Sequence, residues 1–105
     1  MLDWKQYSEW VEGKVVLEGQ DRFVENILGL CGEAGEVAEK AKKQFRDHNR
    51  VTTEAIQLEL GDVLFYVTAV ANMYGSNLEE IARMNLKKLN DRAERGVIRG
   101  EGDNR

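Results

Sequence analysis

Two pairs of acidic residues have the spacing that metal chemistry requires. Glu33 and Glu36 form one pair and Glu59 and Asp62 the other, each spaced i, i+3. On a helix this spacing puts both carboxylates of a pair on one face. Two such helices packed side by side would bring four like charges together, which requires a cation. Because carboxylate oxygens suit hard divalent ions, the pattern predicts a Mg²⁺ site, with Mn²⁺ as an alternative ion.

The surroundings of each acidic pair support this interpretation. Glu59 and Asp62 are the charged residues of a run, 58–74, that is otherwise apolar on nearly every face. A buried and unpaired carboxylate costs several kcal/mol, so two of them in such a run indicate a bound ion or a functional role. The other pair lies among glycines that would allow a helix or a ligand to approach closely: Gly29, Gly32 and Gly35.

Further candidates accompany the two pairs. Glu39 follows Glu36 by one turn and is a candidate fifth ligand, although a surface role is equally supported. Asn85, Lys88 and Arg92 recur at i, i+3 and i+7 in a basic C-terminal quarter of the chain. Lysine and arginine form charge-assisted hydrogen bonds to phosphates, so the group fits a phosphate-binding face. The alternative is that Asn85 satisfies a backbone group while both cations are solvated.

Helices are the elements that must position these side chains. Apolar periodicity is helical throughout, and it predicts helices over residues 3–12, 21–45, 53–74 and 77–95. Residue types predict helix N-termini at Asp21, at Thr52 or Thr53, and at Asn77, and helix C-termini at Gly75 and Gly96. A turn near residues 47–51 would make the second and third helices antiparallel, with the acidic pairs at similar heights. The predicted fold class is all-α, of four-helix bundle type.

The chain organises as one domain. There is no proline, low-complexity tract or repeat in its 105 residues, so nothing marks a linker. The single domain 1–105 divides into an N-terminal helix and loop (1–20), core helices (21–95) and a polar tail (96–105). The aromatic stripe of the first helix is expected in the core or at an oligomer interface, with base stacking as the alternative: Trp4, Tyr7 and Trp10.

Composition narrows the class of protein. The net charge of −4 argues against a general nucleic-acid binder. No apolar run approaches the roughly 20 residues of a membrane helix, and no signal pattern opens the chain. We therefore expect a protein that does not associate with membranes and lies in the cytoplasm. A lone Cys31 among apolar neighbours suggests a buried, reduced thiol.

The acidic motifs resemble those of a known family. The segments GEAGEVAE (32–39) and LELGD (58–62) are similar to the paired E-x-x-E and E-x-x-D motifs of MazG-like nucleoside triphosphate pyrophosphohydrolases. The stretch NLKKLNDR (85–92) resembles the family's N-x-x-K-x-x-x-R. The resemblance covers roughly residues 23–95, and the final GEGDNR is similar to the tail of short, single-domain members.

The resemblance implies Mg²⁺-dependent cleavage between the α- and β-phosphates of a nucleoside triphosphate, with house-cleaning of the nucleotide pool as the role. It implies four metal-holding residues, Glu33, Glu36, Glu59 and Asp62, and four substrate-binding residues, Asn85, Lys88, Arg92 and Tyr66. It also implies a homodimer or homotetramer. Two alternatives stay open: a non-catalytic helical interaction module, and a phosphoribosyl-ATP pyrophosphatase. Base and sugar preference do not follow from the residues.

Overall fold

A computed structural model describes residues 1–47 and 51–96 of the chain. It contains four helices, α1 (Trp4–Lys14), α2 (Gly19–Asp47), α3 (Thr53–Met73) and α4 (Leu78–Glu94). The described residues form no strand, which confirms the all-α class. The expected tail lies almost wholly outside the described residues, as do three residues of the expected turn between α2 and α3.

The helix boundaries follow from capping residues. The Thr52 hydroxyl accepts a hydrogen bond from Ala55 N at 3.1 Å, and the Asn77 carboxamide accepts one from Glu80 N at 2.8 Å. These bonds satisfy amides that have no partner within the first turn of α3 and α4. After α3, Gly75 has a φ of 72°, a left-handed conformation that glycine adopts without strain. The sequence therefore predicted both ends of this turn correctly.

The start of α2 differs from expectation. The helix begins at Gly19, so Asp21 lies inside its first turn and is not its N-cap. Gly19 has a φ of 58°, and this residue redirects the chain from the loop after α1 into the helix. Asp21 still has a favourable position, because an acidic side chain in the first turn complements the helix dipole.

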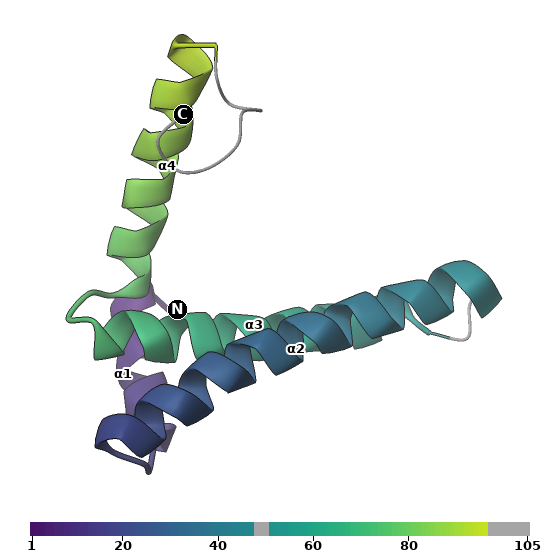
Figure 1. Cartoon of the computed structure of the whole chain (residues 1–105), viewed down its shortest axis with the longest axis horizontal. Coiled ribbons are helices and arrows are strands. Elements are labelled where there is room, and N and C mark those ends of the chain that lie inside the picture. The colour runs from purple at the N-terminus through teal and green to yellow at the C-terminus, as the bar shows by residue number, and fades with distance from the viewer. Residues whose placement is uncertain (48–50, 97–105) are drawn as a thin grey trace.

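The α2–α3 hairpin is the long axis of the fold. The two helices lie side by side and antiparallel, while α1 packs near the far end of α3 and α4 projects away from the hairpin (Figure 1). Helix α3 contacts each of the other three helices, as its apolar surface predicted. Within the described residues α4 packs on α1 and α3 and does not reach α2. The angle between α4 and the α2–α3 hairpin is therefore left open by the described helices (Figure 1).

Arg22 joins three helices where α1, α2 and α3 meet. Its guanidinium donates to both carboxylate oxygens of Glu12 on α1, at 2.7 and 2.8 Å, and to the carbonyl oxygen of Ala69 on α3, at 3.1 Å. Its Nε donates to Asn26 on α2 at 3.2 Å. The hydrogen bonds from Arg22 to Glu12 hold the pKa of this carboxyl below its usual range. The guanidinium fixes α1 against the hairpin.

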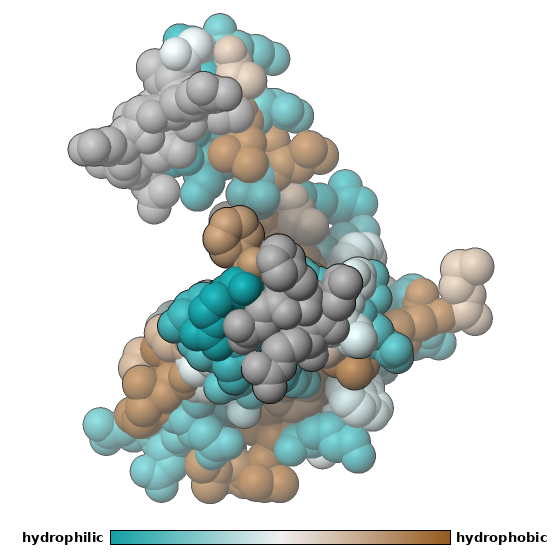
Figure 2. Space-filling model, turned by 90° about the vertical axis from the view of Figure 1, so that its right-hand side faces the viewer, coloured by the Kyte–Doolittle hydropathy of each residue, from teal (hydrophilic) through white to brown (hydrophobic). Residues whose placement is uncertain are grey.

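Large apolar side chains remain uncovered on the single chain. Leu28 is 63% exposed and Leu58 66%, and the expected burial of Cys31 is wrong because its side chain is exposed. Apolar surface lies open among polar side chains over the hairpin and α4 (Figure 2). The radius of gyration is 16.3 Å, against about 13 Å for a compact chain of this length. The single chain thus exposes more apolar surface than a compact monomeric protein of this length usually does.

None of the helices among residues 1–47 and 51–96 combines the length and the apolar character needed to cross a bilayer.

Candidate metal centre

The facing acids of α2 and α3 form a compact carboxylate cluster. One oxygen each from Glu33, Glu59 and Asp62 lies within 4.8 Å of the others, and we call this group the acid cluster. Glu33 comes from α2 and the other two from α3, so the antiparallel hairpin produces the meeting that the spacing predicted. The cluster contains three of the four expected ligands.

Glu36 lies beside the acid cluster. It follows Glu33 by one turn of α2, and its negative charge acts on Glu33, but its oxygens are not within the group of three. Glu39 faces solvent, where its carboxylate pairs with Lys42 at 4.0 Å and Lys43 at 3.9 Å. Glu36 is therefore a neighbour of the cluster and not a member of it, and Glu39 has the surface role.

Burial of the cluster is less complete than the apolar sequence of α3 suggested. The Glu59 side chain is 18% exposed, and Asp62 is exposed. The cluster consequently lies at the surface of the hairpin, and water and solutes reach it in the single chain. The ionised carboxylates of the cluster therefore avoid the full desolvation cost of an apolar interior.

Burial and the neighbouring acids both raise the pKa of Glu33. Partial burial raises the pKa of this carboxyl, and a hydrogen bond shared with Glu59 and the negative charges of Asp62, Glu59 and Glu36 raise it further. A proton bound at Glu33 therefore relieves like-charge repulsion. A divalent cation would relieve it more completely, because it neutralises several carboxylates at once.

A close approach of backbone and ring sets the distance between the two helices. A Cβ atom on Gly29 would lie 2.5 Å from Cζ and 2.8 Å from Cδ1 of the Tyr66 ring, and closer still to Cε1. Only glycine fits there, which explains one of the four glycines of α2. Open space surrounds the Cβ positions of Gly32 and Gly35. Tyr66 thus packs against α2 one turn from Asp62, and its role toward a sugar or base stays a prediction.

Aromatic rings extend from this contact to α1. Phe65 packs edge-on against Tyr66 with ring centroids 5.3 Å apart, and Trp10 packs edge-on against Phe65 at 6.0 Å. Tyr7 lies 5.8 Å from Trp10, and burial together with the charge of Asp62 raises the pKa of its phenol. The stripe on α1 therefore packs beside the acid cluster. The sequence offered Tyr7 only as one member of a stripe.

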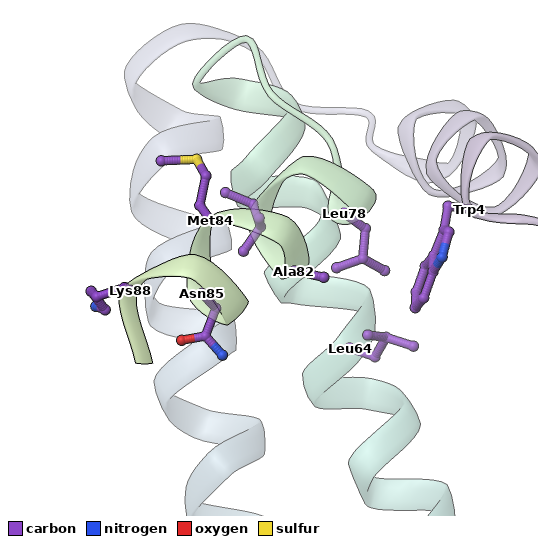
Figure 3. Close-up of a pocket in the computed structure, with 8 residues that line it drawn as sticks. Trp4, Leu64, Leu78, Ala82, Met84, Asn85 and Lys88 are labelled. Carbon is purple, nitrogen blue, oxygen red and sulfur yellow. The ribbon is translucent and has the colours of Figure 1, made fainter. Parts of the chain in front are cut away.

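The expected basic group occupies α4, away from the acid cluster. Asn85 and Lys88 line an open cavity of about 670 Å³ between α4, α3 and Trp4 (Figure 3). Arg92 is 3% exposed. None of the three cluster acids lines this cavity. Within one chain, α4 thus presents these side chains at a separate place from the carboxylates.

The donor set fits a hard divalent ion. Oxygen ligands stand about 2.1 Å from Mg²⁺, so opposite ligands lie roughly 4.2 Å apart and adjacent ones roughly 3 Å. Oxygens within 4.8 Å of one another need only small side-chain movements to reach these separations. The described residues contribute no thiolate or imidazole to the cluster, so its chemistry favours Mg²⁺ or Mn²⁺ over softer metals.

Comparison with known proteins shows the family to which the chain belongs. Residues 23–97 match the MazG nucleotide pyrophosphohydrolase domain. The chain belongs to the MazG family. It is also 49% identical over 82 residues to the gene 37 protein of Mycobacterium phage L5. The aligned region covers 74% of this chain and 72% of that protein. No solved structure matches the chain.

The extent of the MazG match is informative about the site. Residues 23–97 include the acid cluster and the basic residues of α4, whereas α1 precedes the matched segment. The cluster and most of the described helical hairpin with α4 therefore lie in the matched segment, and α1 lies outside it.

Proposed function

We propose that this MazG protein is a Mg²⁺-dependent nucleoside triphosphate pyrophosphohydrolase that releases a nucleoside monophosphate and pyrophosphate. The observation that carries the proposal is the approach of carboxylates from two helices to within 4.8 Å, with Glu33 protonated more readily than an ordinary glutamate. A scaffold gains no stability from such a concentration of negative charge.

The residues divide into two roles. Glu33, Glu59 and Asp62, joined by Glu36, would hold the ion. Bound Mg²⁺ would neutralise the triphosphate and increase the acidity of a nearby water. A carboxylate of the cluster would orient that water and accept its proton. Phosphoryl chemistry of this kind requires little covalent participation by the protein, in agreement with the absence of a nucleophile arrangement in the sequence.

Assembly supplies the second half of the proposed site. The exposed Leu28 and Leu58 and the extended shape favour a homodimer or homotetramer. Because α4 does not reach α2 in one chain, we assign the phosphate-binding role of Asn85, Lys88 and Arg92 to the assembled oligomer. There, α4 of one copy would lie against the hairpin of another.

Pyrophosphate release from a panel of eight nucleotides, assayed with Mg²⁺ and with EDTA, tests the activity. The panel contains the four common ribonucleoside triphosphates and dATP, dGTP, dCTP and dUTP. We expect Mg²⁺-dependent release together with a monophosphate. Asp62→Asn should reduce the rate at least about 100-fold, since it removes a charged ligand. The exposed Glu79→Gln on α4 is a control expected to keep full activity.

Mixing of two inactive variants tests the assembly. Glu59→Gln lacks a cluster acid and Lys88→Ala lacks a proposed phosphate contact. If the site combines two copies, co-refolded mixtures should regain roughly a quarter of the wild-type activity, as random pairing places one intact site in half of the dimers. Failure to regain activity in proven mixed oligomers would place both groups in the same chain.

A helical interaction module is the competing function. It predicts that Glu59→Gln and Asp62→Asn raise the stability of the metal-free protein and remove no metal binding. A phosphoribosyl-ATP pyrophosphatase shares the chemistry, and adding that nucleotide to the panel distinguishes the two substrates.

A further inference from the structure

Lys40 places a positive charge against the acid cluster. It follows Glu33 by two turns of α2, and its Nζ lies 3.6 Å from Oε1 of Glu59 on α3. The side chains are 32% and 18% exposed, so the pair is partly shielded from water. In the sequence Lys40 belongs to a run of basic residues near the end of this helix, a pattern that favours a solvated helix end and has phosphate binding as its alternative.

The neighbouring lysines provide a comparison on the same helix. Lys42 and Lys43 pair with Glu39, within their own helix, and their side chains are 63% and 48% exposed. Lys40 instead crosses to α3 and contacts a carboxylate that also shares a hydrogen bond with Glu33. Its position is therefore defined by the cluster and not by the surface of α2.

The contact has the geometry of an exchangeable ion pair. A direct hydrogen bond between nitrogen and oxygen is about 2.7–3.2 Å long, so at 3.6 Å the attraction is mainly Coulombic. A lysine ammonium on its flexible four-carbon stem can move several ångström at little cost. A divalent ion bound by Glu59 would repel this ammonium, while the phosphates drawn to that ion would attract it.

We propose that Lys40 is the counter-cation of the acid cluster in the metal-free protein and turns to the phosphates of the substrate once the metal is bound. The first half of this proposal concerns metal binding alone. The second half rests on the proposed function, because it requires a polyphosphate ligand. Lys40 would then offset the charge that accumulates on the departing pyrophosphate.

The test compares Lys40→Met with Lys43→Met, which removes a lysine of the same helix that does not contact the cluster. Mn²⁺ binding is measured without nucleotide by the electron paramagnetic resonance signal of the free ion. Lys40→Met should bind Mn²⁺ roughly three- to tenfold more tightly, because a competing cation is absent. Lys43→Met should stay within about twofold of wild type. Lys40→Arg keeps the charge and should also stay close to wild type, and circular dichroism confirms folding of each variant.

Calorimetric binding of inorganic tripolyphosphate at saturating Mn²⁺ tests the second half. Lys40→Met should bind it about tenfold more weakly, and Lys43→Met nearly as well as wild type. Unchanged or weaker Mn²⁺ binding by Lys40→Met would overturn the counter-cation role, and unchanged tripolyphosphate binding would overturn the phosphate role. Tighter Mn²⁺ and weaker tripolyphosphate binding in a protein that hydrolyses no nucleotide would support Lys40 and count against the proposed hydrolysis alone.

Discussion

Replacement of Gly29 by alanine should destabilise the protein although alanine favours a helix. The new Cβ would lie 2.5 Å from Cζ of Tyr66, about 1 Å inside an ordinary contact. Overpacking of this kind costs about 1–3 kcal/mol, whereas the gain in helix propensity is about 1 kcal/mol. We therefore expect a net loss of up to about 2 kcal/mol in the free energy of unfolding.

The matched control lies on the same helix. Gly32 has open space around its Cβ position, so Gly32→Ala should raise the free energy of unfolding by up to about 1 kcal/mol. The two neighbouring substitutions therefore have opposite expected signs. Urea unfolding at one fixed protein concentration measures both, because an oligomer gains stability with concentration.

A double-mutant cycle identifies the cause. In a Tyr66→Ala background the ring is absent, so Gly29→Ala should no longer destabilise the protein. Mn²⁺ binding by Gly29→Ala should also weaken, since wider spacing of α2 and α3 separates the carboxylates. If Gly29→Ala were as stable as Gly32→Ala, the ring contact would not set the helix spacing, and our account of the cluster geometry would be refuted.

Three further predictions concern charge and surface. Arg22→Met removes the guanidinium partner of the half-exposed Glu12 and should lower the free energy of unfolding in urea by about 1–3 kcal/mol. Because the pKa of Glu33 is raised, a proton on this carboxyl competes with the metal, and Mn²⁺ affinity should fall as the pH decreases from neutrality through that pKa. In the metal-free protein the free energy of unfolding should instead fall as the pH rises from the ordinary glutamate pKa through the raised one. Leu58→Lys should shift the sedimentation coefficient toward the monomer, and an unchanged value would exclude that face from the interface.

The sequence was sufficient for most helix boundaries and for identifying the acids that share a helix face. Thr52, Asn77 and Gly75 terminate helices through local bonds between a side chain or backbone and its near neighbours, so their residue types alone indicate the boundaries. The i, i+3 spacing of acids likewise fixes a shared helix face before any packing occurs. Helix α3 is apolar on nearly every face, and this pattern predicted its central position among the helices.

Contacts between distant segments required the tertiary structure. Cys31 has apolar neighbours in sequence, yet it is exposed because none of the four described helices covers that side of α2. The cation at Glu59 comes from Lys40, and no spacing rule within one helix links residues on different helices. The angle of α4, which keeps Lys88 away from the carboxylates, depends on packing at the α1–α3 junction. Local pattern thus determined which side chains could act together, and the packing of the hairpin decided which of them meet.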